Sequence, residues 1–249
     1  MTHKPNLSEP ETTEVPTRIF AVWIGGPIPD IRKVSLESMS SLGLPIQLID
    51  ENNLHEWILR DHPLHRSWQY LSAIHRGDYL RSYLMHYYGG GYSDIKPPRG
   101  TWTEAFRAFE DRNVWVLGYP EFRWGVANFG VSSQPRYQPF NPRWWKYRSL
   151  QLRYRSLIGN GLYAMRPGSE LTALWLQRVE FRLDDLADEL TRNPARVPKE
   201  RGGKDYGGWV SRYPVAWSAL HGDILQPLCW RFRKHVRQSL PAPGLENYQ

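Results

Sequence analysis

In HRGDYLRSYLMHYYGGGYSDIKPP, residues 75–98, the carboxylates Asp78 and Asp94 and the cations Arg81 and Lys96 have types and a spacing that could do chemistry. Asp78 and Arg81 are three residues apart in a helical pattern, so they share one face and can pair. Arg81 falls on the apolar stripe of that helix, where a charge needs a counter-ion or an anionic ligand. Asp94 follows a glycine turn, and Lys96 stands two residues beyond it. An internal ion pair and a ligand-facing site both fit this pattern.

Three glycines, residues 89–91, separate the helical pattern from Asp94. Glycine adopts the left-handed conformation without strain, so one of the three is expected to end the helix. The missing side chains also leave room for a ligand. An Asp at the end of a strand in an open α/β sheet points into the crevice where such folds bind ligands. Arg81 would there offer its donors to ligand oxygens.

The elements that must position these residues alternate along the chain. RIFAVWIGG, from Arg18, is an apolar run ending in glycines, as expected of a buried strand, and LPIQLID is typical of a second strand. Between them a helix is expected over residues 31–43, capped by Asp30 and closed by Gly43. A short helix then stops at Pro63. This alternation predicts a parallel sheet with right-handed crossovers.

Periodicity, caps and turns predict the remaining elements. The apolar stripe predicts a long helix over roughly residues 66–88. Beyond it we expect a helix opened by a Thr101–Glu104 capping box, a strand over 114–120, irregular structure over 121–156, a strand and turn over 157–168, a helix capped by Ser169, a flexible glycine loop over 201–209 and a final helix within 215–236. The irregular stretch has the character of a lid or an acceptor-facing insertion.

Length and composition bound the class of protein. The chain has 249 residues and 41% hydrophobic residues, which suits one α/β domain with a real core. Residues 1–17 are polar and Pro-rich and are expected to form a disordered tail. No signal pattern and no apolar run of about 20 residues is present, so no membrane span is expected. Cys229 is the only cysteine, which excludes an intrachain disulfide and favours a reducing, cytoplasmic compartment.

The formal net charge of +7 favours anionic partners such as phosphates, nucleic acid or lipid head groups. Near the C-terminus, WRFRKHVRQ, residues 230–238, places four cations among aromatic and apolar residues. This segment could make a peripheral contact with an anionic membrane surface. A solvated helix end is the alternative. The aromatic fraction of 14% fits stacking surfaces for bases or sugars, and equally a large aromatic core.

The run GDYLRSYLMHYYGGGYSDIK, residues 77–96, resembles the core of bacterial and fungal glycosyltransferases with a DXD sugar-binding region, the family 32-like enzymes and the capsular polysaccharide synthesis proteins. Their pattern is roughly Ser/Ala-Asp-x-x-Arg, followed by Leu-Tyr-x-x-Gly-Gly-x-Tyr-x-Asp-x-Asp. FAVWIGGPIP is similar to that family's first strand, an Ile-Trp-x-Gly with a Pro-rich turn. The resemblance covers residues 18–100, while IGNGLYAMRPGSEL fits more loosely.

The resemblance implies a GT-A-like fold, an α/β Rossmann-type open sheet with helices on both faces. It implies a single domain over residues 18–249 with irregular insertions, in which residues 18–100 bind the donor and residues 101–249 form the acceptor side. The donor would be a UDP- or GDP-sugar. Its sugar would pass, with retention, to a hydroxyl of a saccharide, lipid-linked or other acceptor.

Site roles also follow from the resemblance, by position. Trp23 would lie beside the nucleotide, and Asp78 would accept hydrogen bonds from ribose or sugar hydroxyls. Arg81 would meet the donor sugar or the diphosphate. Asp94, the first Asp of DXD, would bind the ribose or a metal ion. The remaining implied donor-binding positions are Gly25 and Tyr92.

Lys96 is where the sequence departs from the family, because the second Asp of DXD is usually the direct ligand of Mn²⁺ or Mg²⁺. Lysine cannot bind a cation, but it could neutralise the diphosphate in the metal's place. Arg81, Asp94 and Lys96 would then be the catalytic residues. Alternatively, a metal binds through Asp94 and a late residue such as Asp223 or His221. A third interpretation is a non-catalytic or donor-hydrolysing nucleotide-sugar-binding protein, and a fourth is a solvent-facing lysine.

Four later residues are candidates for acceptor contacts or a lid. Asn160 lies between two glycines in a strand-like segment, and His221 lies two residues before Asp223. Lys204 and Trp209 lie in a glycine loop that could close over a bound donor. For His221, an ordinary loop before the final helix is the competing interpretation.

Two rival functions can be weighed from the sequence. A dinucleotide oxidoreductase would need Gly-x-Gly-x-x-Gly after the first strand, and IGGPIPD does not supply it. A sugar- or nucleic-acid-binding module would fit the charge and the aromatic residues. Nucleic-acid binders need no buried carboxylates, however, so the order Asp78, Arg81, Asp94 argues against a nucleic-acid partner.

Overall fold

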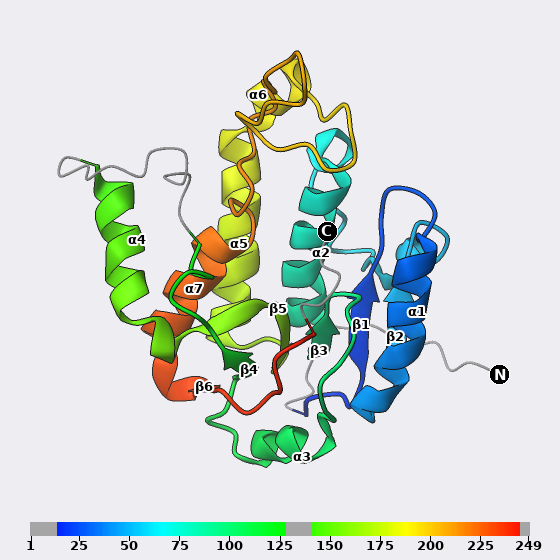
Figure 1. The fold of residues 1–249 in the computed structure, drawn as a ribbon, viewed down its shortest axis with the longest axis vertical. Coiled ribbons are helices and arrows are strands. Elements are labelled where there is room, and N and C mark those ends of the chain that lie inside the picture. Colours follow the sequence, from blue (N-terminus) through cyan, green and yellow to red (C-terminus); the bar gives the residue numbers. More distant parts are fainter. Residues whose placement is uncertain (1–13, 128–140, 245–249) are drawn as a thin grey trace.

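Six strands form one sheet in the computed structural model, which describes residues 14–127 and 141–244 (Figure 1). The strands are β1 (Ile19–Val22), β2 (Ile46–Ile49), β3 (Gly90–Ser93), β4 (Val116–Pro120), β5 (Ile158–Met165) and β6 (Val236–Arg237). Their order across the sheet is β2-β1-β3-β5-β4-β6. The arrangement is a single α/β domain with a Rossmann-like open sheet, as expected.

Strand direction changes within the sheet. β1 pairs in parallel with β2 and β3, whereas β5 runs antiparallel to both β3 and β4, and β6 is parallel to β4. The expected parallel arrangement therefore holds for the first three strands, and the complete sheet is mixed. Pro120 at the end of β4 pairs with Ile158 at the start of β5. The chain thus re-enters the sheet at the same end of the strands at which it left, so β4 and β5 run antiparallel.

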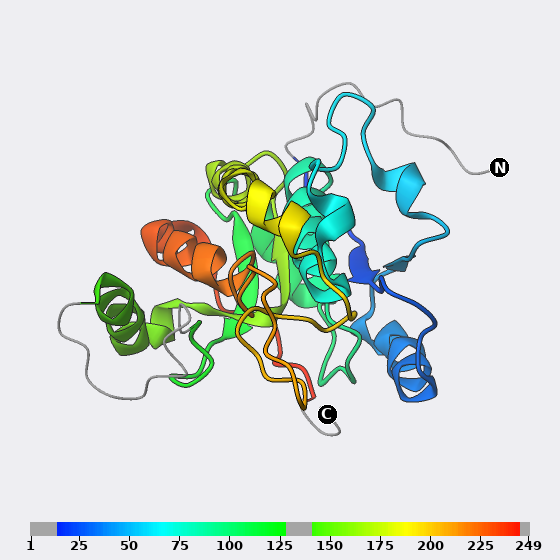
Figure 2. The same cartoon turned by 90° about the horizontal axis from the view of Figure 1, so that it is seen from above.

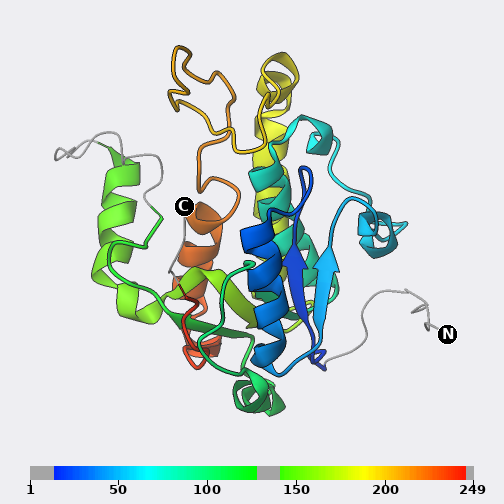
Figure 3. The ribbon, with the colours of Figure 1, turned by 45° about the vertical axis from the view of Figure 1, so that its right-hand side comes forward.

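Helices cover both faces of the sheet (Figure 2). The α-helices are α1 (Asp30–Ser38), α2 (Ala73–Tyr87), α3 (Thr103–Phe106), α4 (Pro142–Leu152), α5 (Glu170–Asp185), α6 (Ala187–Arg192) and α7 (Gly222–Arg231). Short 3-10 helices are η1 (Met39–Leu42), η2 (Leu54–Trp57), η3 (Trp68–Tyr70), η4 (Arg107–Glu110), η5 (Tyr154–Ser156) and η6 (Arg233–His235). One apolar cluster joins the sheet to α2, α5 and α7, and a second joins it to η1, α3 and η4. Figure 3 shows α1 in front of β1 and β2.

Strand order creates a switch point between β1 and β3. The chain leaves β1 through α1 to β2 on one side, and returns through α2 to β3 on the other side of β1. In open α/β sheets, ligands bind in the crevice at the carboxyl ends of the strands on either side of such a point. Trp23 follows β1 and Asp94 follows β3. The fold therefore places two of the predicted site residues at the edge where a ligand crevice is expected.

Two glycines of the run before Asp94, Gly89 and Gly91, have separate structural roles. Gly89 has a φ of 61° and its amide donates to the Leu84 carbonyl, so it ends α2 in the left-handed conformation as expected. A Cβ on Gly91 would lie 2.8 Å from the Trp102 ring and 2.9 Å from Ile19. The space left by Gly91 is therefore filled by the core rather than by a ligand.

Several expected helix starts differ from the structure. Pro29 occupies the N-cap of α1, and Asp30 lies inside the first turn, where it bonds Lys33. The expected 66–88 helix is divided, because Leu71 is extended between η3 and α2. The short helix before Pro63 is reduced to η2.

Of the two predicted N-terminal caps, the one at Thr101 does not form and the one at Ser169 does. Trp102 is the N-cap of α3, and Glu104 pairs with Arg107 instead of closing a capping box with Thr101. Ser169 caps α5 as predicted, since its hydroxyl accepts from the Thr172 amide.

Two elements were not expected. α4 lies inside the stretch predicted to be irregular, and its start carries a recognisable signal, since Asn141 accepts from the Arg143 amide and Pro142 stands at the first helical position. Residues 128–140 of that stretch lie outside the described residues, as do 1–13 of the expected tail. β6 follows α7 as a two-residue edge strand, which is too short to leave a periodic pattern.

Candidate functional site

Asp94 is the centre of a buried charged cluster just beyond β3. Its Oδ1 accepts from Arg81 Nη2 at 2.9 Å and from the Tyr92 hydroxyl at 3.1 Å. Its Oδ2 lies 3.0 Å from Lys96 Nζ. Its amide donates to the Gly161 carbonyl of β5, which fixes the backbone. Both carboxylate oxygens are therefore held by partners within the protein.

Arg81 extends from α2 toward Asp94 and connects the helix to β5. Its Nη1 donates to the Asn160 carbonyl at 3.3 Å and to His221 Nδ1 at 3.2 Å. The guanidinium also lies over the Tyr92 ring, 4.6 Å from its centroid. Arg81 was predicted to lie on the apolar stripe of the helix. Its charge and its donors there find partners in an ion pair, a carbonyl and an aromatic face. Arg81 Nε is buried and has no hydrogen-bond partner among the described residues.

Asp78 and His221 lie on the inner side of this cluster. Asp78 Oδ1 is 3.7 Å from Arg81 Nη1 and 3.8 Å from His221 Nδ1. His221 stacks on Trp175, and its Nε2 lies 3.3 Å from the Tyr163 hydroxyl. Since Arg81 donates to Nδ1, the imidazole is neutral and carries its proton on Nε2. His221, predicted as an acceptor or lid residue, is a buried member of the cluster.

Burial and neighbouring charges set the protonation states in the cluster. Burial raises the pKa of Asp78 to about 7, because Arg81 offsets only part of that effect and Asp94 adds repulsion. Burial also opposes the ionised form of Asp94, but Arg81 and Lys96 outweigh it and hold the pKa of that carboxyl below its usual value. Burial and Arg81 lower the pKa of His221 well below its usual range. Near neutral pH, two cations therefore face one firmly ionised carboxylate.

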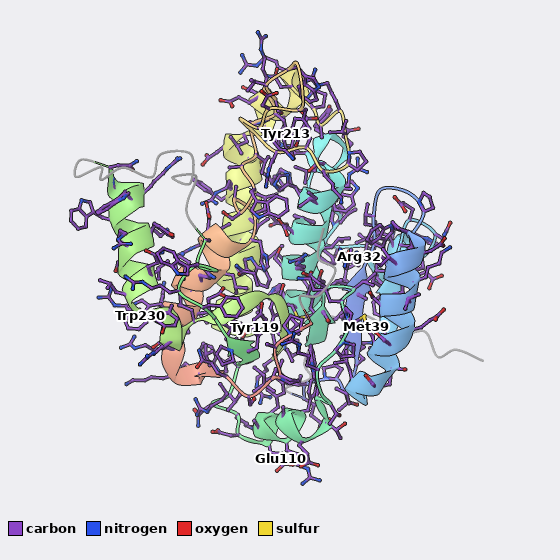
Figure 4. The ribbon with its side chains drawn as sticks, in the orientation of Figure 1. Arg32, Met39, Glu110, Tyr119, Tyr213 and Trp230 are labelled. Atoms are coloured by element: carbon purple, nitrogen blue, oxygen red, sulfur yellow. The ribbon has the colours of Figure 1, made fainter. Side chains whose placement is uncertain are left out.

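Tyr119 and Gly161 are site residues that the sequence did not reveal. The Gly161 amide donates to the Tyr119 hydroxyl at 3.4 Å. A Cβ on Gly161 would lie 3.3 Å from Lys96 Nζ, 3.4 Å from Asp94 Oδ2 and 3.5 Å from that hydroxyl. Tyr119, labelled on β4 in Figure 4, thus reaches the Asp94–Lys96 pair across β5. Only the pairing of β4 with β5 brings these positions together, and that pairing has no local sequence signal.

Arg32 fixes the turn between Asp94 and Lys96 from the α1 side. Its Nη1 donates to the Ile95 carbonyl at 2.9 Å, so the first turn of α1 is tied to the segment that carries the charged pair (Figure 4). An arginine in a surface helix carries no distinctive signal in the sequence. Its role becomes visible only when its bond to the segment after β3 is known.

Trp23 and Gly25 lie in the loop after β1. The Trp23 indole donates to the Gly26 carbonyl at 2.9 Å, and the Gly25 amide donates to Glu51 at 2.5 Å. A Cβ on Gly25 would lie 2.5 Å from Ala73 Cβ and 3.7 Å from Pro198 Cβ. This loop therefore packs closely against the start of α2 and the segment that leads to the glycine loop.

Lys204 and Trp209 lie in an exposed turn over residues 204–211. Trp209 stacks on Tyr206 at 4.8 Å, and Lys204 Nζ lies 4.8 Å from the Tyr206 ring centroid. The base of the loop is anchored on α2, because His75 lies 3.0 Å from the Tyr213 hydroxyl. Trp209 also contacts the Arg196 guanidinium, which lies 3.7 Å from its ring centroid and precedes the loop. The described contacts of Lys204 and Trp209 do not include the Asp94 cluster.

Asn160 and Asp223 occupy different positions relative to the cluster. The Asn160 carbonyl accepts from Arg81, while its side-chain Oδ1 is buried without a hydrogen-bond partner among the described residues. Asp223 lies in the first turn of α7 and accepts from the Ser218 hydroxyl at 2.6 Å. Its pKa is raised by burial, and its charged neighbours are arginines and a lysine rather than Asp94.

The described residues offer no ready set of ligands for a divalent cation. Within them, no group of three or more His, Cys, Asp or Glu side chains is placed to hold a metal ion. Both oxygens of Asp94 already face cationic or hydroxyl donors. A Mn²⁺ or Mg²⁺ ion would need carboxylate or carbonyl oxygens at a position that Lys96 now occupies with a positive charge. The cluster does not fit the expected cation.

Comparison with known proteins adds no identification. No protein-family model matches the chain, and no curated protein matches it significantly. The likeness of residues 18–100 to a glycosyltransferase family therefore rests on the motifs themselves. In the part of the chain that the structure describes, no helix combines the length and the apolar character needed to cross a bilayer.

Proposed function

We propose that the protein is a glycosyltransferase that moves a sugar from a nucleotide sugar to an acceptor hydroxyl. One observation carries the proposal, which is the position of the Asp78–Arg81–Asp94–Lys96 cluster at the switch point of the sheet. Ligands of open α/β sheets bind at such points. The order and spacing of these residues match the family motif in all but one position.

The charges of the cluster suit a nucleoside diphosphate. Arg81 and Lys96 together exceed the charge of Asp94, so a diphosphate would find a surplus of positive charge there. Asp78, with its raised pKa, can accept or donate a hydrogen bond to a ribose or sugar hydroxyl. Trp23, in the loop after β1, would offer an aromatic surface to the base. A UDP- or GDP-sugar meets these requirements, with Gly25 and Tyr92 as further parts of the donor site.

We further propose that Lys96 replaces the divalent cation of related enzymes. The support is the geometry around Asp94, whose Oδ2 is bound by Lys96 at 3.0 Å where a metal ion would otherwise be needed. An ammonium group at this position can stabilise the negative charge that develops on a departing diphosphate. Arg81 would share that charge, and Asp94 would hold both cations in place.

The proposed reaction needs no protein nucleophile. The bond from the anomeric carbon to the diphosphate oxygen breaks, and a bond from the acceptor oxygen to the same face of that carbon forms. The acceptor hydroxyl gives its proton to an oxygen of the leaving diphosphate. Catalysis would then come from positioning the two substrates and from charge stabilisation by Arg81 and Lys96. Asn160 Oδ1, which has no hydrogen-bond partner among the described residues, could accept a hydrogen bond from an acceptor saccharide hydroxyl.

A panel of nucleotide sugars tests this proposal. The full chain is incubated with UDP-, GDP- and CDP-sugars, with and without saccharide acceptors, and both released nucleoside diphosphate and glycosylated product are measured. We expect one donor to be consumed, and Asp94→Asn to abolish that activity. Asp30→Asn, which changes an exposed carboxylate on α1, is the matched control.

The outcomes of the panel separate the alternatives. Diphosphate release without any product would favour the donor-hydrolysing alternative. Nucleotide binding without turnover, with binding followed in parallel by thermal shift, would favour the non-catalytic alternative. The absence of both binding and turnover with every donor would contradict the proposed function.

A further inference from the structure

The positive charge of the chain is concentrated in one stretch. Residues 122–157 contain seven of the 32 lysines and arginines and none of the 25 aspartates and glutamates. In the rest of the chain the two signs balance, so the whole formal charge of +7 resides in this stretch. The described part of the stretch consists of residues 122–127, α4, η5 and the link to β5. An excess of one sign within one stretch of the chain indicates an oppositely charged partner.

α4 presents an apolar stripe to solvent. Leu150 is buried, and Tyr147 packs against the core cluster of α5 and α7. Trp145 and Leu152 are seven residues apart, so they lie two turns apart on the same side of the helix. They are 50% and 73% exposed, respectively. A leucine and a tryptophan left in water on one side of a helix mark a surface that gains free energy when it is covered.

Cations flank this stripe and continue onto the end of α7. Arg153 lies over the Trp230 ring at 5.0 Å, and Arg233 lies over the same ring at 4.5 Å. Trp230, labelled in Figure 4 near the end of α4, thus joins the two elements. We call this the α4–α7 surface, defined by Trp145, Leu152, Arg153, Trp230 and Arg233. Asp223 faces α4 from the inner side, where it is buried near Lys146.

We propose that the α4–α7 surface docks the protein onto an anionic lipid membrane. Exposed tryptophan and leucine beside arginines are the composition of interfacial helices, which bury apolar side chains at the head-group boundary while cations meet anionic lipids. Leu152 favours lipid over nucleic acid, because an aliphatic side chain enters acyl chains but does not stack on bases. The segment 230–238 contributes Trp230 and Arg233 to this surface. It is not an independent membrane helix, since it continues through η6 into the edge strand β6.

Vesicle flotation with the full chain tests the inference. Vesicles of phosphatidylcholine alone are compared with vesicles in which about a third of the lipid is phosphatidylglycerol, at about 0.15 M salt and at higher salt. We expect binding to the anionic vesicles alone, weakening as salt rises. Trp145→Ser/Leu152→Ser and Arg153→Glu/Arg233→Glu should each weaken the partition by about tenfold or more.

A matched control lies on α1, at the opposite end of the molecule (Figures 1 and 2). Ile31 and Val34 are 58% and 65% exposed there, and Ile31→Ser/Val34→Ser should leave vesicle binding unchanged. Thermal midpoints check that each variant is folded. Equal binding of the folded surface variants and the wild type overturns the inference. So does binding to neither kind of vesicle, or binding to a single-stranded oligonucleotide in place of anionic vesicles.

Discussion

Lys96 Nζ lies 3.0 Å from Asp94 Oδ2, and both groups are largely buried at the end of β3. The lysine stands two residues after Asp94, at the position of the second Asp in the DXD motif that the surrounding sequence resembles. The pair changes what Asp94 can do, since a carboxylate already paired with a cation on each oxygen has little affinity for a divalent metal ion.

Asp94→Asn should abolish donor turnover and lower stability. The variant leaves Arg81 and Lys96 buried without their shared counter-charge, and breaking a buried pair in this way costs about 3 kcal/mol or more. Urea unfolding gives the change in the free energy of unfolding, and nucleotide release is measured well below the unfolding midpoint. Turnover at the wild-type rate in folded Asp94→Asn would count against the site.

Lys96→Asp should convert the site to metal dependence. The variant places a second carboxylate beside Asp94, and two adjacent buried carboxylates repel each other unless a cation separates them. We expect nucleoside diphosphate binding to disappear in EDTA and to return when Mn²⁺ is added. Lys33→Asp, an exposed charge change on α1, is the control and should bind as the wild type does. Metal-free binding of undiminished affinity in Lys96→Asp would show that Lys96 does not contact the diphosphate.

The contribution of Asp78 to the free energy of unfolding should fall as pH rises from about 4 to about 7. The pKa of Asp78 is about 7 in the folded protein, whereas the ordinary value of an Asp carboxyl, expected in the unfolded chain, is 3.8. The folded state therefore keeps a proton that the unfolded chain releases in this range. Its contribution is fully present below the lower value and lost as pH passes the higher one. Asp78→Asn removes this dependence. The free energy of unfolding of the variant, minus that of the wild type, should therefore rise across the window and level off above it.

His75 and His221 have lowered pKa values, which act in the opposite direction on the total stability. They are present in both proteins, so the difference removes the part of their effect that does not depend on the contact of His221 with Asp78. Urea unfolding at several pH values measures that difference. A difference that does not change with pH would mean that Asp78 ionises normally in the folded protein.

Gly161→Ala should weaken nucleotide binding with little change in stability. The added methyl would lie 3.3 Å from Lys96 Nζ and 3.4 Å from Asp94 Oδ2, so the pair must shift by a few tenths of an ångström. Gly77→Ala is the matched control, because a Cβ there meets nothing within 4 Å. Inside α2 that change should raise stability by about 0.5–1 kcal/mol. Titration calorimetry and urea unfolding follow both variants, and equal nucleotide affinity in the two would refute a tight fit at Gly161.

The sequence predicts most of the elements that build the site, but not their pairing. Apolar runs and caps indicated β1, β2, β4, β5 and α5, and the glycine run indicated the end of α2. The antiparallel insertion of β5 between β3 and β4 could not be read from local pattern, because it depends on contacts between distant segments. α4 was missed although Asn141 and Pro142 form a recognisable start.

Only part of the candidate site could be predicted, because some of its residues meet through contacts between distant segments. Helical spacing paired Asp78 with Arg81, and the resemblance to the glycosyltransferase motif grouped both with Asp94 and Lys96. Tyr119 and Gly161 reach the cluster only through the β4–β5 pairing and carry no motif. His221 was predicted as an acceptor or lid residue, but stacking on Trp175 and bonding to Arg81 make it a buried member of the cluster.

Titration calorimetry of the wild type with UDP and with GDP, in EDTA and in Mn²⁺, tests the central claim most directly. The Lys96–Asp94 pair predicts that one nucleotide binds in EDTA with an affinity that Mn²⁺ does not improve, and that Lys96→Met loses this binding. Binding that appears only with Mn²⁺, or that is unchanged in folded Lys96→Met, would contradict the role assigned to Lys96.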